Sequence, residues 1–154
     1  MNAESRLAEL QLSLPPPPPP GGIYRPVVVL QNVAYVSGTG PLRPDGSYVT
    51  GRVGAELSLE EGRAAARQVG LTILAVLRAE LGSLNRVRRL VKSLGMVNAT
   101  PAFTQHPQVI NGYSELLAEV FGREAGLGAR SAVGLGSLPG NIAVEIEAIF
   151  ELEP

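Results

Sequence analysis

One arginine in the C-terminal third has the setting that most clearly predicts chemistry. Arg130 opens an apolar stretch within Gly128–Gly134, Gly-Ala-Arg-Ser-Ala-Val-Gly. Burying a guanidinium there is costly unless an anion meets it, because the group cannot shed its charge. Its planar donors match a carboxylate through two parallel hydrogen bonds. The sequence therefore predicts either a site for a small carboxylate at Arg130 or an Arg–Glu ion pair that fastens two strands.

Composition excludes several other kinds of site. The chain has no Cys, so it has no disulfide, thiolate nucleophile or thiolate metal site. Its single histidine, His106, excludes a multi-histidine metal site or a pair of catalytic histidines within one chain. Gly38-Thr39-Gly40 is too short for a dinucleotide fingerprint, and no Gly-Lys-Ser/Thr follows a glycine loop. We expect no metal and no cofactor.

Length and charge set the class of protein. The 154 residues fit one domain, and 45% hydrophobic with 18% charged residues predict a packed globule. A net charge of -1 gives no general attraction to nucleic acid or to an anionic membrane. No apolar run approaches the roughly 20 residues that span a bilayer, and charges interrupt the N-terminal segment, so we expect a cytoplasmic protein.

The pattern divides the chain into an N-terminal extension, residues 1–21, and a domain, residues 22–154. A short helix is expected over Met1–Leu14, and the proline segment Pro15–Pro20 ends it. Six prolines favour polyproline II, which serves as a stiff spacer and less often as a ligand for aromatic grooves. We interpret the proline segment as a spacer.

Apolar periodicity predicts strands and two long helices in the domain. Strands are expected at residues 27–30 and 33–36, joined by a tight hairpin, at 87–97 and at 143–152. Ser58 and Glu61 form a capping box for a helix that Gly82 ends, and a second helix is expected over about 105–121 with Thr104 as its cap. The basic group Arg86, Arg88, Arg89 and Lys92 is interpreted as a solvated sheet edge. The pattern predicts an α+β fold, a mixed sheet with two helices on one face.

Several motifs taken together resemble the RidA (YjgF/L-PSP, reactive intermediate deaminase) family. They are Ala-Arg-Ser at Arg130, then Leu138-Pro139, then Val-Glu-Ile-Glu-Ala around Glu145, with Arg130 and Glu145 separated by 145 − 130 = 15 residues. Tyr24, the run Tyr35-Val36-Ser37-Gly38, and Asn111 followed by Tyr113 extend the resemblance over roughly residues 22–151.

The resemblance implies a fold, an assembly and a reaction. The fold is chorismate-mutase-like and the assembly is a homotrimer. In the family, the arginine matching Arg130 grips the carboxylate of a 2-imino or 2-enamino acid, and the glutamate matching Glu145 orients water or moves a proton. The residue matching Tyr24 reaches this pocket across a subunit interface. Substrate-binding positions are expected at Ser37, Gly38, Asn111 and Ala132. The products would be ammonia and a 2-oxo acid.

The chain also departs from the family pattern. Ala132 stands where many members have Cys, and Tyr24-Arg25-Pro26 replaces the usual Tyr-Ser-Gln. A longer interval between Asn111 and Arg130 predicts an enlarged loop that includes residues 123–126. These features are typical of a divergent branch often labelled as endoribonucleases.

Three functions follow as hypotheses. The first is a deaminase of imines and enamines. The second is a non-enzymatic trimer that binds a small carboxylate such as a 2-oxo acid for regulation. The third is an endoribonuclease, which the lack of paired histidines and of net positive charge disfavours.

Overall fold

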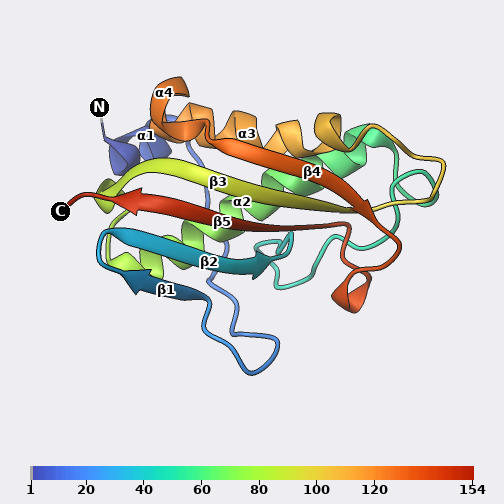
Figure 1. Ribbon diagram of the computed structural model, residues 1–154, viewed down its shortest axis with the longest axis horizontal. Helices are drawn as coiled ribbons and strands as arrows, with labels where there is room; N and C mark the ends of the chain where they lie inside the picture. The colour runs from blue at the N-terminus through green and yellow to red at the C-terminus, as the bar shows by residue number, and fades with distance from the viewer. Residues whose placement is uncertain (1) are drawn as a thin grey trace.

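The computed structural model describes residues 2–154 as a five-stranded mixed sheet with its helices on one face (Figure 1). The strand order is β1-β2-β5-β3-β4, in which β3 and β4 are parallel and the other neighbours are antiparallel. The α+β fold expected from the sequence is confirmed. Its elements are β1 (Val27–Leu30), β2 (Val33–Thr39), β3 (Val87–Asn98), β4 (Ala129–Leu135), β5 (Val144–Leu152), α1 (Ala3–Glu9), α2 (Leu59–Leu81), α3 (His106–Phe121), α4 (Arg123–Gly126) and the 3-10 turns η1 (Leu84–Arg86) and η2 (Pro139–Asn141).

Alternation along β5 separates the two faces of the sheet. Ile146, Ala148 and Phe150 are buried beneath the helices, whereas Glu145 and Glu147 lie on the opposite face, which we call the open face. Apolar side chains therefore fill the space under α2 and α3, and acidic side chains of the same strand remain available on the other side.

The caps of the long helices follow the sequence in part. Ser58 and Glu61 form the predicted capping box, and Gly82 ends α2 in the left-handed region with φ 81°. Thr104 does not cap α3, so this prediction is wrong. The N-cap is Gln105 and its side chain makes no capping bond, while Pro107 in the first turn removes one of the donors that a cap would satisfy.

The loop predicted at residues 123–126 is wrong, whereas the solvated edge predicted for the basic group is not contradicted. Residues 123–126 form the short helix α4 rather than an open loop, and Gly126 packs so closely on the backbone of Leu117 that a Cβ would collide with it. The basic stretch at the start of β3 agrees with the predicted solvated sheet edge, because β4 pairs with β3 only from Lys92 onward and Arg88 and Arg89 lie before that point. Arg88 and Arg89 are exposed, and Arg88 pairs with Glu151 at 3.3 Å.

The N-terminal extension packs on the domain. Leu7 of α1 is buried in the core, and the Glu4 carboxylate accepts hydrogen bonds from the Leu84 N–H at 2.9 Å and from Arg78 at 2.6 Å. The helix predicted over Met1–Leu14 ends at Glu9, and Met1 lies outside the described residues. None of the helices within residues 2–154 is long and apolar enough to cross a membrane.

Candidate functional site

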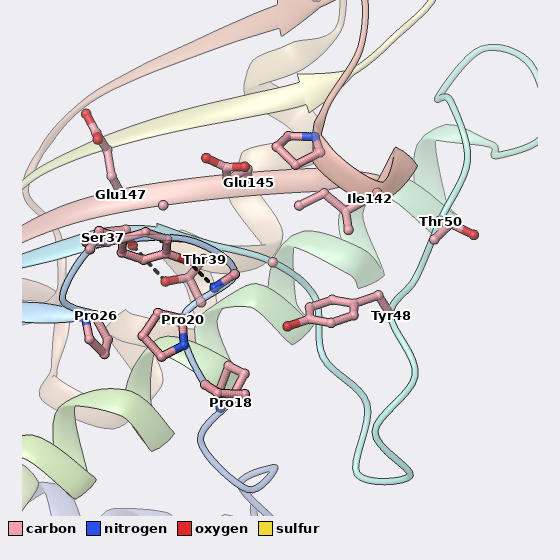
Figure 2. Close-up of a pocket in the computed structure, with 17 residues that line it drawn as sticks. Pro18, Pro20, Pro26, Ser37, Thr39, Tyr48, Thr50, Ile142, Glu145 and Glu147 are labelled. Carbon is pink, nitrogen blue, oxygen red and sulfur yellow. Dashed lines mark hydrogen bonds between the residues drawn. The ribbon is translucent and has the colours of Figure 1, made fainter.

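A pocket of about 810 Å³ opens where the end of β2, the start of β5 and the proline segment meet (Figure 2). Its polar floor comes from β2 and β5, and its sides come from the proline segment, the loop after β2 and η2. The lining residues are Pro18, Pro19, Pro20, Gly21, Tyr24, Pro26, Ser37, Gly38, Thr39, Gly40, Tyr48, Thr50, Pro139, Gly140, Ile142, Glu145 and Glu147. Four residues predicted for the site, Tyr24, Ser37, Gly38 and Glu145, thus lie together.

The Glu145 carboxyl group occupies space that a glycine leaves open. A Cβ atom on Gly38 would overlap the Glu145 carboxylate, so any larger residue at position 38 would displace the Glu145 side chain. The pairing of β2 with β5 shifts register between Val36 and Thr39, which is where Ser37 and Gly38 pass over β5. The glycine at position 38 therefore positions Glu145 by leaving room for its side chain.

Burial raises the pKa of the Glu145 carboxyl group above its usual value, and the negative charge of Glu147 raises it further. Glu145 belongs to none of the ion pairs formed within residues 2–154. An acid that is partly desolvated and unpaired in this way holds a proton more readily than an ordinary glutamate, which suits it to accepting and returning one.

Tyr24 is fixed by the segment that precedes it. Its hydroxyl oxygen accepts a hydrogen bond from the Gly21 N–H at 3.0 Å, and its ring is about half exposed at the pocket. The Ser37 hydroxyl donates to the Arg25 carbonyl oxygen at 2.6 Å, which ties the backbone next to Tyr24 to β2. Tyr24 is therefore held at the rim by contacts on both sides of it in the chain.

Arg130 lies on the helix face of the edge strand β4. It is paired with Ser93 of β3, whose hydroxyl meets the Tyr113 hydroxyl of α3 at 2.8 Å. The guanidinium donates to the Ser114 hydroxyl at 2.9 Å and to the Pro107 carbonyl at 3.2 Å. Both partners are neutral and use two of its five donors. Burial lowers the pKa of Arg130.

The structure does not contain the Arg–Glu strut considered as an alternative. Among the ion pairs of residues 2–154, none includes Arg130. Its guanidinium group donates only to a neutral hydroxyl and a neutral carbonyl. Three of its five N–H donors therefore remain for an anion.

Asn111 and Ala132 accompany Arg130. Asn111 follows Pro107 by four residues and precedes Ser114 by three, so the three share one face of α3. Ala132 lies two residues after Arg130 on β4, on the same face of the strand, and packs against the core. We call Arg130, Asn111 and Ala132 the cationic group, and Tyr24, Ser37, Gly38 and Glu145 the acidic group.

The two groups lie on opposite faces of the sheet. Arg130 is opposite Ser93 and Glu145 is opposite Met96, with β3 between their strands. They are separated by about 10 Å along the strands and about 10 Å across them. One chain thus brings Tyr24 together with Glu145 and keeps both away from Arg130. This differs from the expected arrangement, in which Tyr24 alone came from a second subunit.

A family model described as "YjgF/chorismate mutase-like, putative endoribonuclease" matches residues 4–149. The chain belongs to this YjgF family. The resemblance stated from the motifs around Arg130 and Glu145 is therefore confirmed, as is the chorismate-mutase-like fold.

Relatives of this YjgF family member cover nearly its whole length. Protein TCP17 from Trypanosoma cruzi is 41% identical over 148 residues, which are 96% of this chain and 92% of that protein. The crystal structure of a protein described as a putative endoribonuclease from Shewanella oneidensis MR-1 has 31% identity and a TM-score of 0.93, covering 99% of this chain and 100% of that one. RidA from an Antarctic Psychrobacter has 27% identity and a TM-score of 0.62, covering 88% and 93%.

Sequence reasoning missed the pocket walls. Glu147, Tyr48 and Ile142 line the pocket but were not predicted there, and the prolines were interpreted as a spacer. The position of the prolines in the sequence could have predicted that they line the pocket. A stiff segment that ends only a few residues before Tyr24 cannot lie far from Tyr24.

Proposed function

We propose that this chain hydrolyses 2-imino and 2-enamino acids to 2-oxo acids and ammonia, at a site completed between two copies of the chain. The observation that carries the proposal is the pair of unneutralised charges, Arg130 and Glu145. Each is partly buried and belongs to no ion pair within the described chain. A partly buried charge without a counter-ion is costly, and a ligand or a second subunit can supply the missing partner.

The chemistry needs only these groups. Arg130 binds the substrate carboxylate through two of its remaining donors, which fixes the position of C2. Glu145 accepts a proton from a water that adds to the C=N carbon of the iminium. It then returns the proton to nitrogen and takes the proton of the new hydroxyl group, so that the C=O bond forms as the C–N bond breaks and ammonia leaves. Ammonia finally takes that proton as ammonium, which restores the carboxylate. An enamine first takes a proton at C3 to become the same iminium.

The open face of the sheet supports an assembly of copies. The exposed fractions of Val28 (49%), Tyr35 (45%) and Val133 (41%) are large for apolar side chains. Val28 and Tyr35 line a hollow there together with Leu94 and Ile149. Apolar surface of this kind favours association. In a closed ring such as the homotrimer, the cationic group of one copy can meet the acidic group of the next.

An endoribonuclease fits the acidic pocket less well. Glu145 and Glu147 are its only charged lining residues within the described chain, so the phosphates of RNA would be repelled there. A regulatory protein that binds a carboxylate without turnover would use the same two groups. Measuring products as well as binding separates this regulatory function from the deaminase.

The test is release of ammonia and 2-oxo acid from an imino acid generated enzymatically in the assay. We expect Arg130→Ala and Glu145→Gln each to lower kcat/KM by about 100-fold. The matched controls Arg123→Ala, an exposed arginine on α4, and Glu151→Gln, on the same strand as Glu145, should retain activity. If wild-type protein releases no more product than buffer while a known deaminase does, the proposal is wrong. Calorimetric binding of a 2-oxo acid without turnover would instead favour the regulatory function.

A further inference from the structure

The proline segment ends inside the candidate site. Pro18, Pro19 and Pro20 line the same pocket as Glu145, and Figure 2 shows Pro18 and Pro20 beside the opening below Ser37 and Thr39. Pro16 and Pro17, one turn earlier, are exposed and do not line it. The segment is therefore more than a connection between α1 and the sheet.

The proline segment is held at both ends. Before it, Pro15 is buried, Leu12 and Leu14 pack against the core, and α1 is fastened to the domain. After it, the Gly21 N–H donates to the Tyr24 hydroxyl at 3.0 Å. The next residue, Arg25, accepts a hydrogen bond from Ser37 of β2 at 2.6 Å, which ties this loop to the sheet. Each proline has a fixed φ near −65°, so the segment loses little freedom when it lines a ligand. A stiff segment anchored twice is suited to act as a fixed wall.

The chemistry of the pocket sides is apolar. Five prolines and Ile142 contribute rings and methyl groups, and Tyr24 and Tyr48 contribute aromatic rings. Both tyrosines line this pocket, and the pKa of Tyr48 is raised by burial and then by the charge of Tyr24. The acids Glu145 and Glu147 are confined to β5. A ligand in this pocket would direct its nitrogen toward β5 and its side chain toward the prolines.

We propose that Pro18, Pro19 and Pro20 form a specificity-determining wall, and that the substrates are 2-imino acids with a branched or aromatic apolar side chain. This inference rests on the proposed function for the carboxylate and nitrogen ends of the substrate. The size of the pocket agrees with it, since about 810 Å³ lies in the range that suits ligands far larger than a three-carbon imino acid.

The experiment compares the wild type with a triple variant, Pro18→Ala, Pro19→Ala, Pro20→Ala, and with the control Pro16→Ala, Pro17→Ala. Two readouts are taken on each protein. One is kcat/KM for the imino acids derived from leucine and from alanine, and the other is calorimetric binding of the matching 2-oxo acids. We expect the wild type and the control to prefer the leucine-derived ligand by about 10-fold or more, and the triple variant to lose most of that preference.

The two readouts keep the outcomes separate. The proposal that the prolines determine specificity is wrong if the wild type binds the two 2-oxo acids equally. It is also wrong if the triple variant keeps the wild-type preference. Preferential binding that disappears in the triple variant supports the wall even if no imino acid is turned over, a result that would refute only the deaminase. Should the triple variant fail to fold, Tyr48→Ala removes another apolar side of the same pocket and is expected to reduce the same preference.

Discussion

Burial and a neighbouring charge both raise the pKa of the Glu145 carboxyl group. Desolvation disfavours the carboxylate, and Glu147, two residues along the same strand, adds repulsion. The proposed reaction needs the carboxylate form to accept a proton from water. Activity should therefore be lost as pH falls through a pKa that lies above the ordinary value of a glutamate.

Replacing Glu147 by Gln removes the repulsion and leaves the burial. We expect the acid limb of the kcat/KM profile to move to lower pH, because the pKa of Glu145 falls when a like charge is removed. Steady-state rates across the acid limb measure this shift. Glu151→Gln is the control, since Glu151 pairs with Arg88 and does not line the pocket. A limb at the same pH in all three proteins would show that Glu145 does not control it.

Arg130 differs from Glu145 because burial does not change its protonation state. Burial weakens the preference of its guanidinium for the proton, yet an arginine keeps its charge at any working pH. Its two neutral partners orient the group without cancelling the charge. The sequence could predict that this arginine needs an anion, but it could not tell whether the anion was internal, because that depends on which strand faces β4.

Among the elements, β3 and α3 are joined by one buried polar contact. The Ser93 and Tyr113 hydroxyls meet at 2.8 Å, and both side chains are at most 1% exposed. This contact fixes α3 against the strand that pairs with β4, and so sets the position of Ser114 and Pro107 relative to Arg130.

Removing one partner of that contact should destabilise the fold more than removing both. Ser93→Ala leaves the Tyr113 hydroxyl buried without a partner, which we expect to cost about 1 to 3 kcal/mol. The double variant with Tyr113→Phe should be closer to the wild type than the sum of the two single changes predicts. Unfolding in denaturant at one protein concentration measures all four free energies. Strict additivity would mean that the two hydroxyls do not interact.

The elements themselves were largely predictable. Apolar alternation and the turn at Gln31-Asn32 identify β1 and β2, and Ser58, Glu61 and Gly82 mark both ends of α2. Local signals suffice where the deciding contacts are close in sequence. The cap of α3 and the helix at residues 123–126 were mispredicted, because a proline and a close backbone contact with α3 decide them.

At the scale of the whole molecule, the candidate site could be predicted as a set of residues but not as a geometry. Periodicity assigns faces within a strand, whereas the relative faces of Arg130 and Glu145 depend on their common partner β3. The place of Pro18–Pro20 was also hidden, since it depends on where α1 packs. Contacts between residues far apart in sequence thus determine both the separation of the cationic group from the acidic group and the position of the proline wall.

The division into two groups makes subunit complementation the most direct test. Arg130→Ala and Glu145→Gln proteins should each be inactive alone. If each site of a closed trimer joins Arg130 of one copy to Glu145 of the next, every trimer that contains both variants has about one site in three with both residues intact. We predict that co-expressed mixed trimers, purified through a different tag on each variant, regain about one third of wild-type kcat. Mixed oligomers that stay inactive would contradict the account, because a site contained within one chain cannot be rescued by its neighbour.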